Sequence, residues 1–176
     1  MKGMVFTEFL EMVGTTFSVD MVEDILDDAK PASGGAYTAV GTYDHGELVA
    51  MVVALSQRTD IAVPDLVKAF GKHLFSVFST NYHQFFEHVP DAFAFLEGIE
   101  DVIHAQVLKL YPDADLPKFD CLREGNVLHM TYHSLRHFAD LAEGLILGCG
   151  AYFGETLTLE REELDANTTR FTVTKQ

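Results

Sequence analysis

The 176-residue sequence contains no tryptophan, two cysteines, and only 12 lysines and arginines against 27 aspartates and glutamates. The formal net charge of −15 argues against nucleic acid or an anionic membrane as a partner, because both are negatively charged. Cys121 and Cys149 form neither a Cys-x-x-Cys pair nor a zinc-binding pattern. We therefore expect no disulfide framework, and a reducing cytoplasm is the expected location.

The sequence also lacks an apolar run of about 18 residues, the length that a transmembrane helix needs. The N-terminal stretch contains the acidic residues Glu8 and Glu11 and has no basic region followed by an uninterrupted apolar run. No signal peptide is therefore expected. The composition is 48% hydrophobic and 22% charged and includes 14 phenylalanines, which fits a large apolar interior. We expect residues 1–176 to form a single domain.

Apolar residues in the first two thirds of the chain recur with the period of helices. Gly71 interrupts one strongly apolar helical face and predicts close packing there, against either a crossing helix or a bound ligand. Predicted helices cover or begin at these positions: residues 4–14, Ser18, Asp44 with a capping-box partner at Glu47, Pro64, and Pro90-Asp91 continuing to Pro112.

In the last third of the chain the hydrophobic period changes from 3.6 to two. Residues 117–123 and 127–135 predict a hairpin around 124–126. A helix is predicted over 137–153, and a final hairpin is predicted to turn near 165–167. The expected class is α+β, with a helical N-terminal part followed by an antiparallel sheet that contains one inserted helix.

Two features of this pattern carry chemistry. Tyr132, Ser134 and Arg136 alternate along the predicted strand 127–135, so they are expected to share one face. Hydroxyls and a guanidinium at the end of an apolar face suit a flat amphipathic ligand with carboxylates, although an ordinary half-buried strand is the alternative. His104 lies off the main apolar stripe of its helix and is either a core histidine or a metal ligand.

Together these residues resemble a known family. His104 followed by Tyr132-x-Ser134-x-Arg136 resembles the haem-nitric oxide/oxygen-binding (H-NOX) domains, bacterial relatives of the haem domain of soluble guanylate cyclase. The resemblance covers essentially the whole chain, and the order of elements agrees. Three further stretches resemble the family: Met1-Lys2-Gly3, Phe70-Gly71 and Leu116-Pro117.

The resemblance implies a haem b buried between the helical part and the sheet. Covalent attachment is not expected, since the sequence has no Cys-x-x-Cys-His. In the family, the histidine that matches His104 is the proximal iron ligand, and neutral imidazole is an ordinary axial ligand. The residues matching Tyr132, Ser134 and Arg136 bind the haem propionates. The proline matching Pro117 presses on the haem and distorts it.

The distal side of the haem decides which gas binds. Some family members hold dioxygen with a tyrosine whose matching position here is Leu141, assisted by positions that are here Phe9 and Leu74. Bound dioxygen needs a hydrogen-bond donor, which none of these residues supplies, whereas nitric oxide does not. We therefore expect binding of nitric oxide, and possible binding of carbon monoxide, without stable dioxygen binding. The expected distal pocket is lined by Val5, Phe9, Leu74, Phe78, Leu141 and Leu145.

The resemblance implies a sensor and not an enzyme. Nitric oxide weakens the bond from iron to His104, the helix that bears it relaxes, and a separate protein responds. The expected partner is a histidine kinase, a diguanylate cyclase or a phosphodiesterase. Some relatives bind zinc near the C-terminus, but residues 155–176 contain neither cysteine nor histidine, so no zinc is expected.

Alternative functions follow from the same residues. The chain could be a haem enzyme, or a passive haem or nitric oxide binding protein without a signalling partner. An apolar distal side offers no acid or base, which weakens the enzyme hypothesis. Ser134 beside His133 and His137 could indicate a hydrolase, but strand alternation points His133 away and no Gly-x-Ser-x-Gly is present.

Overall fold

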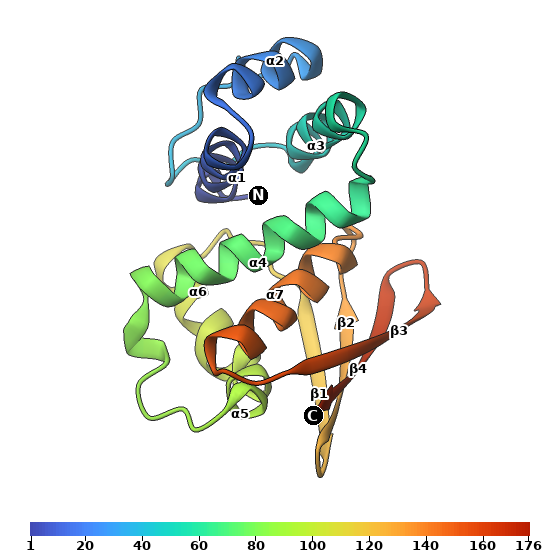
Figure 1. The fold of residues 1–176 in the computed structure, drawn as a ribbon. Helices are drawn as coiled ribbons and strands as arrows, with labels where there is room; N and C mark the ends of the chain where they lie inside the picture. Colours follow the sequence, from blue (N-terminus) through green and yellow to red (C-terminus); the bar gives the residue numbers. More distant parts are fainter. The chain divides into compact units, whose positions relative to one another are not determined.

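The computed structural model describes residues 1–176 and divides them into two compact units, Met1–Phe70 and Gly71–Gln176 (Figure 1). Helix α4 (Val63–Asn81) begins in the first unit and ends in the second. None of the helices combines the length and the apolar character that a membrane crossing requires. The first unit also contains three complete helices: α1 (Gly3–Thr16), α2 (Val19–Ala29) and α3 (His45–Thr59).

Side-chain caps fix where two helices of the first unit begin. The Ser18 hydroxyl accepts a hydrogen bond from the Met21 N–H at 3.0 Å, at the start of α2. The Asp44 carboxylate accepts one from the Gly46 N–H at 2.8 Å, at the start of α3. Both predicted helix starts are confirmed, because each cap satisfies a backbone donor that has no partner within the helix.

The predicted capping box of α3 does not form as expected. Instead of reaching back to the backbone of Asp44, the Glu47 carboxylate accepts hydrogen bonds from the Ser33 hydroxyl at 2.6 Å and the Tyr37 phenol at 2.8 Å. Burial, and then the Glu47 carboxylate, raises the pKa of Tyr37 to about 12. The Tyr37 ring also stacks on Phe6, with ring centroids 4.6 Å apart. Glu47 therefore ties the loop between α2 and α3 to the unit.

The second unit combines helices with a sheet in the predicted α+β order. All neighbouring strands are antiparallel, in the order β1-β2-β4-β3. Besides the end of α4, its elements are these: η1 (His83–Phe85), α5 (Ala92–Glu97), η2 (Ile99–His104), α6 (Ala105–Leu110), β1 (Lys118–Glu124), β2 (Val127–His133), α7 (Ala139–Tyr152), β3 (Leu157–Asp165) and β4 (Thr168–Lys175).

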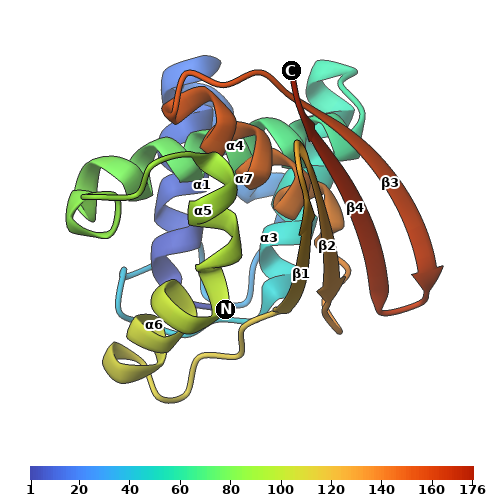
Figure 2. The same ribbon diagram turned by 90° about the horizontal axis from the view of Figure 1, so that it is seen from below.

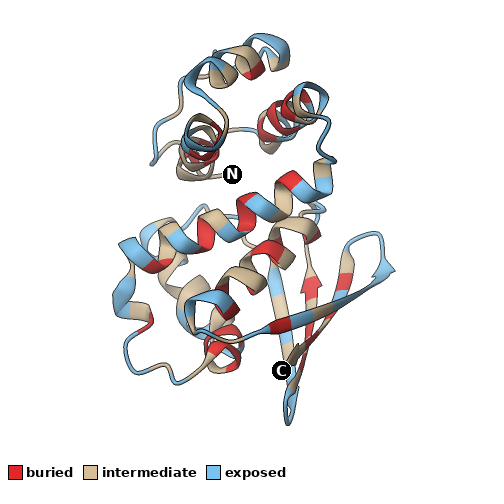
Figure 3. Cartoon of the chain, in the orientation of Figure 1, coloured by how far each residue is buried: buried red, intermediate tan, exposed pale blue.

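The core of the second unit lies between α5, α7 and one face of the sheet (Figure 2). Burial alternates along β2, where Leu128, Met130 and Tyr132 are only 0%, 0% and 3% exposed. Buried residues are more frequent on the central strands β2 and β4 than on the edge strands β1 and β3 (Figure 3). The period-two prediction for β2 is confirmed up to His133, where the strand ends.

The region predicted as one helix from Pro90 to Pro112 is divided into three segments. Asp91 caps α5 by accepting a hydrogen bond from the Ala94 N–H at 2.8 Å, which confirms the predicted start. After Gly98, however, the chain forms the π-helical segment η2 before α6 resumes α-helical geometry. A π-helix widens the backbone ring and changes the direction of the side chains that follow, so uniform α-helical counting fails here.

Gly71 marks a close approach of two helices in the second unit. A Cβ atom at Gly71 would lie 2.5 Å from the Leu141 carbonyl oxygen and 2.8 Å from the Gly144 Cα atom, both on α7. Of the two alternatives that the sequence left open, the partner of Gly71 is therefore a crossing helix. The absence of a side chain allows this contact and places α7 tightly against α4.

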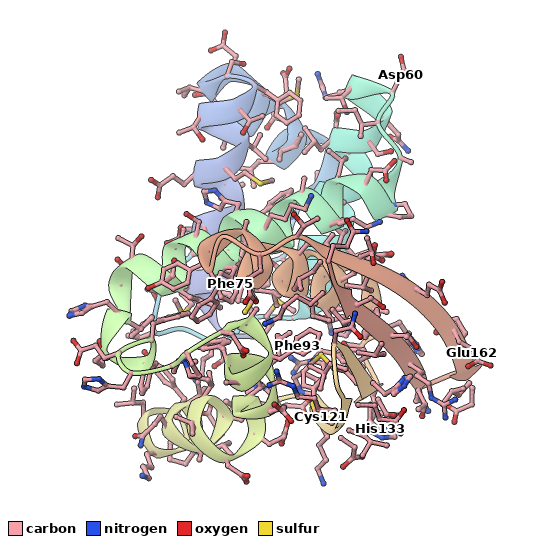
Figure 4. The ribbon with its side chains drawn as sticks, turned by 60° about the horizontal axis from the view of Figure 1, so that its bottom comes forward. Asp60, Phe75, Phe93, Cys121, His133 and Glu162 are labelled. Carbon is pink, nitrogen blue, oxygen red and sulfur yellow. The ribbon has the colours of Figure 1, made fainter.

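A cluster of charges joins the start of α5 to the end of β4. The Lys175 ammonium donates hydrogen bonds to Asp91 at 3.0 Å and to Glu155 at 2.8 Å. The same ammonium lies 5.2 Å from the centroid of the Phe93 ring. Phe93 projects from α5, and Cys121 lies on β1, the strand that contacts this helix (Figure 4). This charged link holds the helical layer and the sheet together at one end of the unit.

Candidate functional site

His104 is the last residue of η2, and a carboxylate of the same segment holds its ring. Its Nδ1 atom lies 2.9 Å from Oε1 of Glu100, and the His104 side chain is 15% exposed. The same Glu100 oxygen accepts a hydrogen bond from the backbone N–H of Phe119 at 3.0 Å. One carboxylate oxygen therefore connects the histidine to the beginning of β1.

Phe119 connects His104 to the inner face of the sheet through ring contacts. Its ring centroid lies 6.1 Å from that of His104 and 5.3 Å from that of Tyr132. Phe119 and Tyr132 are also direct partners in the β1–β2 register. The predicted iron ligand and the predicted start of the clamp thus belong to one contiguous group of side chains.

Tyr132, Ser134 and Arg136 come together, but not through strand alternation. Tyr132 is buried near the end of β2, whereas Ser134 and Arg136 lie in the turn that follows the strand. The predicted shared strand face is therefore wrong beyond His133. The backbone N–H of Arg136 donates a hydrogen bond to the Ser134 hydroxyl at 3.2 Å. Burial raises the pKa of Tyr132, so its phenol stays protonated.

The guanidinium of Arg136 is paired with the loop before β1. Its Nη2 atom lies 2.9 Å from the Asp115 carboxylate, and Nη1 donates to the Asp115 carbonyl at 3.2 Å. The Arg136 side chain is 23% exposed, whereas that of Asp115 is 74% exposed. Pro117 is half-buried in the same loop, directly before the first residue of β1. Arg136 thus links the turn after β2 to the loop that bears Pro117.

The histidine beside Ser134 forms its contacts elsewhere. The His133 ring lies 3.2 Å from Thr168 through Nδ1 and 3.2 Å from Asp120 through Nε2. The Ser134 hydroxyl accepts the N–H of Arg136 instead of bonding an imidazole. The residues therefore do not form the nucleophile-and-base arrangement that a hydrolase needs.

The predicted distal residues all lie on helices. Phe9 on α1 is fully buried in the first unit, and its ring packs edge-on against Phe70 with centroids 5.3 Å apart. Leu74 on α4 is 3% exposed, while Leu141 on α7 is half-buried. Three more are half-buried: Val5 on α1, Phe78 on α4 and Leu145 on α7. None of these six side chains contains a hydrogen-bond donor.

Sequence analysis missed two residues of this site, Glu100 and Asp115. An acid four residues before a histidine is a spacing that brings two helical side chains together, so Glu100 had a detectable signal. Asp115 had none, because its contact with Arg136 spans 21 positions and depends on how the loop folds. Neither residue belongs to the sequence signature that pointed to this site.

Comparisons with known proteins identify one family and several solved structures that resemble this chain. The family model described as Haem-NO-binding matches residues 2–161. The ferrous unliganded H-NOX protein from K. algicida is 33% identical over 100% of this chain and 97% of its own, with a TM-score of 0.94. The carbon monoxide complex of the H-NOX from Shewanella woodyi is 39% identical over 100% of this chain and 95% of its own, with a TM-score of 0.86.

A third similar structure is the H-NOX protein from S. oneidensis in the Fe(II)NO state. It is 27% identical over 100% of this chain and 99% of its own, with a TM-score of 0.92. A comparison with curated protein sequences finds no match. The family match and the structural similarities over the full chain lead to one conclusion: this chain belongs to the haem-NO-binding, or H-NOX, family of haem-binding gas-sensor domains.

Proposed function

We propose that this chain is a single haem-binding domain that senses nitric oxide and regulates a separate signalling protein. The observation that carries the proposal is the arrangement of His104, whose Nδ1 atom is held by Glu100 at 2.9 Å. A metal-binding histidine usually has its second ring nitrogen held by a carboxylate or a carbonyl in this way. In a member of the haem-NO-binding family, this arrangement supports His104 as the iron ligand.

The donor chemistry at His104 fits haem iron. An ionised carboxylate only accepts hydrogen bonds, so the proton of a neutral His104 ring resides on Nδ1. The lone pair then resides on Nε2, in the form of imidazole that binds haem iron. Ferrous haem supplies the site at which the gas binds, and His104 holds it from one side.

The polar turn after β2 fits the carboxylate edge of haem. Tyr132 and Ser134 contribute hydroxyls, and Arg136 contributes a permanent charge that can bind a carboxylate through two hydrogen bonds. The guanidinium already holds a carboxylate, that of the exposed Asp115 at 2.9 Å. We infer that a haem propionate replaces or shares this partner. Pro117, in the same loop as Asp115, is proposed to press on the haem and distort it.

We infer that the haem is haem b and is held without covalent bonds. Both cysteines are free thiols. Burial raises the pKa of Cys121 to about 11 and also raises the pKa of Cys149. The Cys149 thiol is fully buried and donates to the Ala92 carbonyl at 3.8 Å. Neither residue belongs to a haem-attachment sequence, so retention depends on His104, the clamp and apolar packing.

The proposed gas selectivity rests on apolar side chains. Residues that hold dioxygen must donate a hydrogen bond, and the proposed gas-side residues offer none. Nitric oxide binds ferrous haem without such help, and carbon monoxide is a second possible ligand. The H-NOX proteins from S. oneidensis and Shewanella woodyi, in their Fe(II)NO and Fe(II)CO states, support this assignment. The proposed gas-side residues are Val5, Phe9, Leu74, Phe78, Leu141 and Leu145.

The proposed output is a change of conformation that a second protein recognises. If His104 left the iron, η2 would lose one of its attachments, while Glu100 and Phe119 would still connect it to β1. We propose a cytoplasmic histidine kinase, diguanylate cyclase or phosphodiesterase as the partner. The charge of −15 favours a docking surface with excess basic residues and disfavours nucleic acid.

Absorption spectroscopy of the haem-loaded chain tests the proposal. We expect a ferrous spectrum with one histidine ligand, no stable dioxygen complex in air, and an immediate change with nitric oxide to a form that His104 has left. A chain that takes up no haem would contradict the proposal. Hydrogen exchange then tests the proposed switch: exchange in η2 and α6 should increase on adding nitric oxide, and unchanged exchange would favour a passive binding protein.

A further inference from the structure

Glu100 contacts both the proposed iron ligand and the backbone of the sheet. Its Oε1 atom lies 2.9 Å from His104 Nδ1 and accepts the Phe119 N–H at 3.0 Å. The first contact lies within η2, and the second crosses 19 residues of sequence to β1. One oxygen thus receives two donors, one from the helical layer and one from the sheet.

We propose that Glu100 is a positioning residue that sets how strongly His104 binds iron and couples the position of His104 to β1. This inference rests on the proposed function. A charged acceptor on Nδ1–H draws the ring proton toward itself, which increases the electron density at Nε2 and the donor strength of the ring. It also fixes the tautomer and the direction in which Nε2 points.

The contact between Glu100 and His104 lies within the π-helical segment η2. A π-helix within a longer helix frequently marks a functional position, because its extra residue re-aims the side chains that follow. Glu100 and His104 both lie in this segment, and their carboxylate–imidazole contact is only partly exposed, at 35% and 15% of the two side chains. Partial burial strengthens the attraction relative to a contact in open water.

The second bond of Glu100 leads to the proposed propionate clamp. Phe119, whose N–H binds Glu100, pairs in register with Tyr132, and their rings lie 5.3 Å apart. If His104 moved away from iron, the hydrogen bond between its Nδ1 atom and Glu100 Oε1 would change in strength, while the Phe119 N–H would keep the carboxylate attached to β1. Glu100 therefore connects η2 to the strand pair β1–β2, which ends at the proposed clamp.

The decisive variant is Glu100→Gln in the haem-loaded chain. The amide oxygen can still accept both N–H groups, but the negative charge is gone, so the ring becomes a weaker donor. We expect a lower iron–histidine stretching frequency in the resonance Raman spectrum of the ferrous protein. We also expect a higher reduction potential, because the weaker donor stabilises ferric iron less. A more complete release of His104 on adding nitric oxide should accompany both changes.

The matched control is Asp101→Asn, which removes the same charge from an exposed neighbour in the same segment. This variant should leave the iron–histidine frequency unchanged. An unchanged frequency in Glu100→Gln would refute the proposal, and so would an equal shift in Asp101→Asn. Glu100→Ala extends the test, because it removes both hydrogen bonds and should also increase hydrogen exchange at the Phe119 amide.

A nitrogen NMR measurement keeps the inference separate from haem binding. In the wild-type chain without haem, neutral His104 should carry its proton on Nδ1, whereas free histidine prefers Nε2. A His104 ring protonated mainly on Nε2 would overturn the positioning role whether or not haem binds. Failure of the wild-type chain to take up haem would instead refute the proposed function.

Discussion

The two segments that form the proposed site differ in how they are held. The segment from Tyr132 to Arg136 is held by several contacts. These are the pairing of β2 with β1, the hydrogen bond to the Ser134 hydroxyl and the ion pair with the loop residue Asp115. The η2 segment presents a single histidine held by a single carboxylate oxygen. A ligand attached at both places is therefore held by many moderate contacts on one side and by one contact on the other.

The number of contacts that hold each segment determines how it responds when one contact breaks. An attachment that depends on one bond can be lost completely when that bond breaks, whereas an attachment shared among several groups is weakened gradually. The η2 side is thus suited to respond to a gas, and the strand side is suited to retain the haem while it responds. Variants in the two segments should consequently differ in kind as well as in size.

The largest effect is expected from His104→Gly, which removes the only proposed iron ligand. The variant should lose haem during purification, or retain it only when imidazole is added to replace the missing ring. The ferrous absorption spectrum with and without imidazole measures this. His83→Gly is the control, since the His83 side chain is 73% exposed in η1. A ferrous spectrum identical to the wild type in His104→Gly would rule the assignment out.

A graded loss is expected from Arg136→Ala on the strand side. Removing the one permanent charge of the clamp should weaken haem binding by about 1–3 kcal/mol, and each 1.4 kcal/mol is about tenfold in affinity. Competitive haem titration measures the change. Asp115→Asn is the matched variant, because it removes the carboxylate that occupies Arg136 at 2.9 Å and should maintain or increase haem affinity. Equal affinities of Arg136→Ala and the wild type would count against the clamp.

The two segments also differ in how far the sequence predicts them. Alternation along β2 correctly predicted that Tyr132 lies on an apolar face, which Leu128 and Met130 complete in the structure, because a period-two pattern depends on local geometry. The approach of Ser134 to Arg136 was expected for the wrong reason, since the strand ends at His133 and a turn joins them. The residue types suggested the proposed clamp, although the assumed strand geometry was incorrect.

On the helical side, the sequence drew attention to His104 but did not predict the π-helix that contains it. The apolar period continues through η2, so no local pattern marks the change of geometry. The hydrogen bond from Phe119 to Glu100 that accompanies η2 comes from 19 residues away, and such tertiary contacts lie beyond propensity and period. Gly71 is an intermediate case, because its residue type predicted close packing and only the structure identified α7 as the partner.

A third variant adds a hydrogen-bond donor to the proposed gas-side residues, none of which supplies one. Leu141→Tyr places a phenol at the position proposed to match the tyrosine of dioxygen-binding family members. A hydrogen bond to a charged group contributes about 1.5–3 kcal/mol, and bound dioxygen carries partial negative charge, so dioxygen affinity should rise about tenfold or more. Ferrous spectra in air-saturated buffer measure this, with Leu141→Phe as the control for size. Equal behaviour of the two variants would show that the hydroxyl does not act on the bound gas.

The smallest effect is expected at Asp91, where the helical layer and the sheet are joined. Hydrogen bonding from the Ala94 N–H, and then from Lys175, holds the pKa of Asp91 below its usual range. The carboxylate therefore contributes stability above its unfolded pKa of about 3.9, and this contribution is lost as the pH falls through the lower folded value.

Asp91→Asn retains an oxygen that can cap α5 but removes the charge that pairs with Lys175 at 3.0 Å and Arg123 at 3.4 Å. Near the surface such pairs contribute about 1 kcal/mol or less, so the free energy of unfolding should fall by that amount at neutral pH. The difference from wild type should vanish in acid, because protonation of Asp91 then removes the same charge from the wild-type chain. Urea unfolding across this pH range measures the difference, with Asp101→Asn as the control. A variant whose deficit persists in acid would mean that Asp91 acts through its cap and its packing, and that charge does not join the two layers.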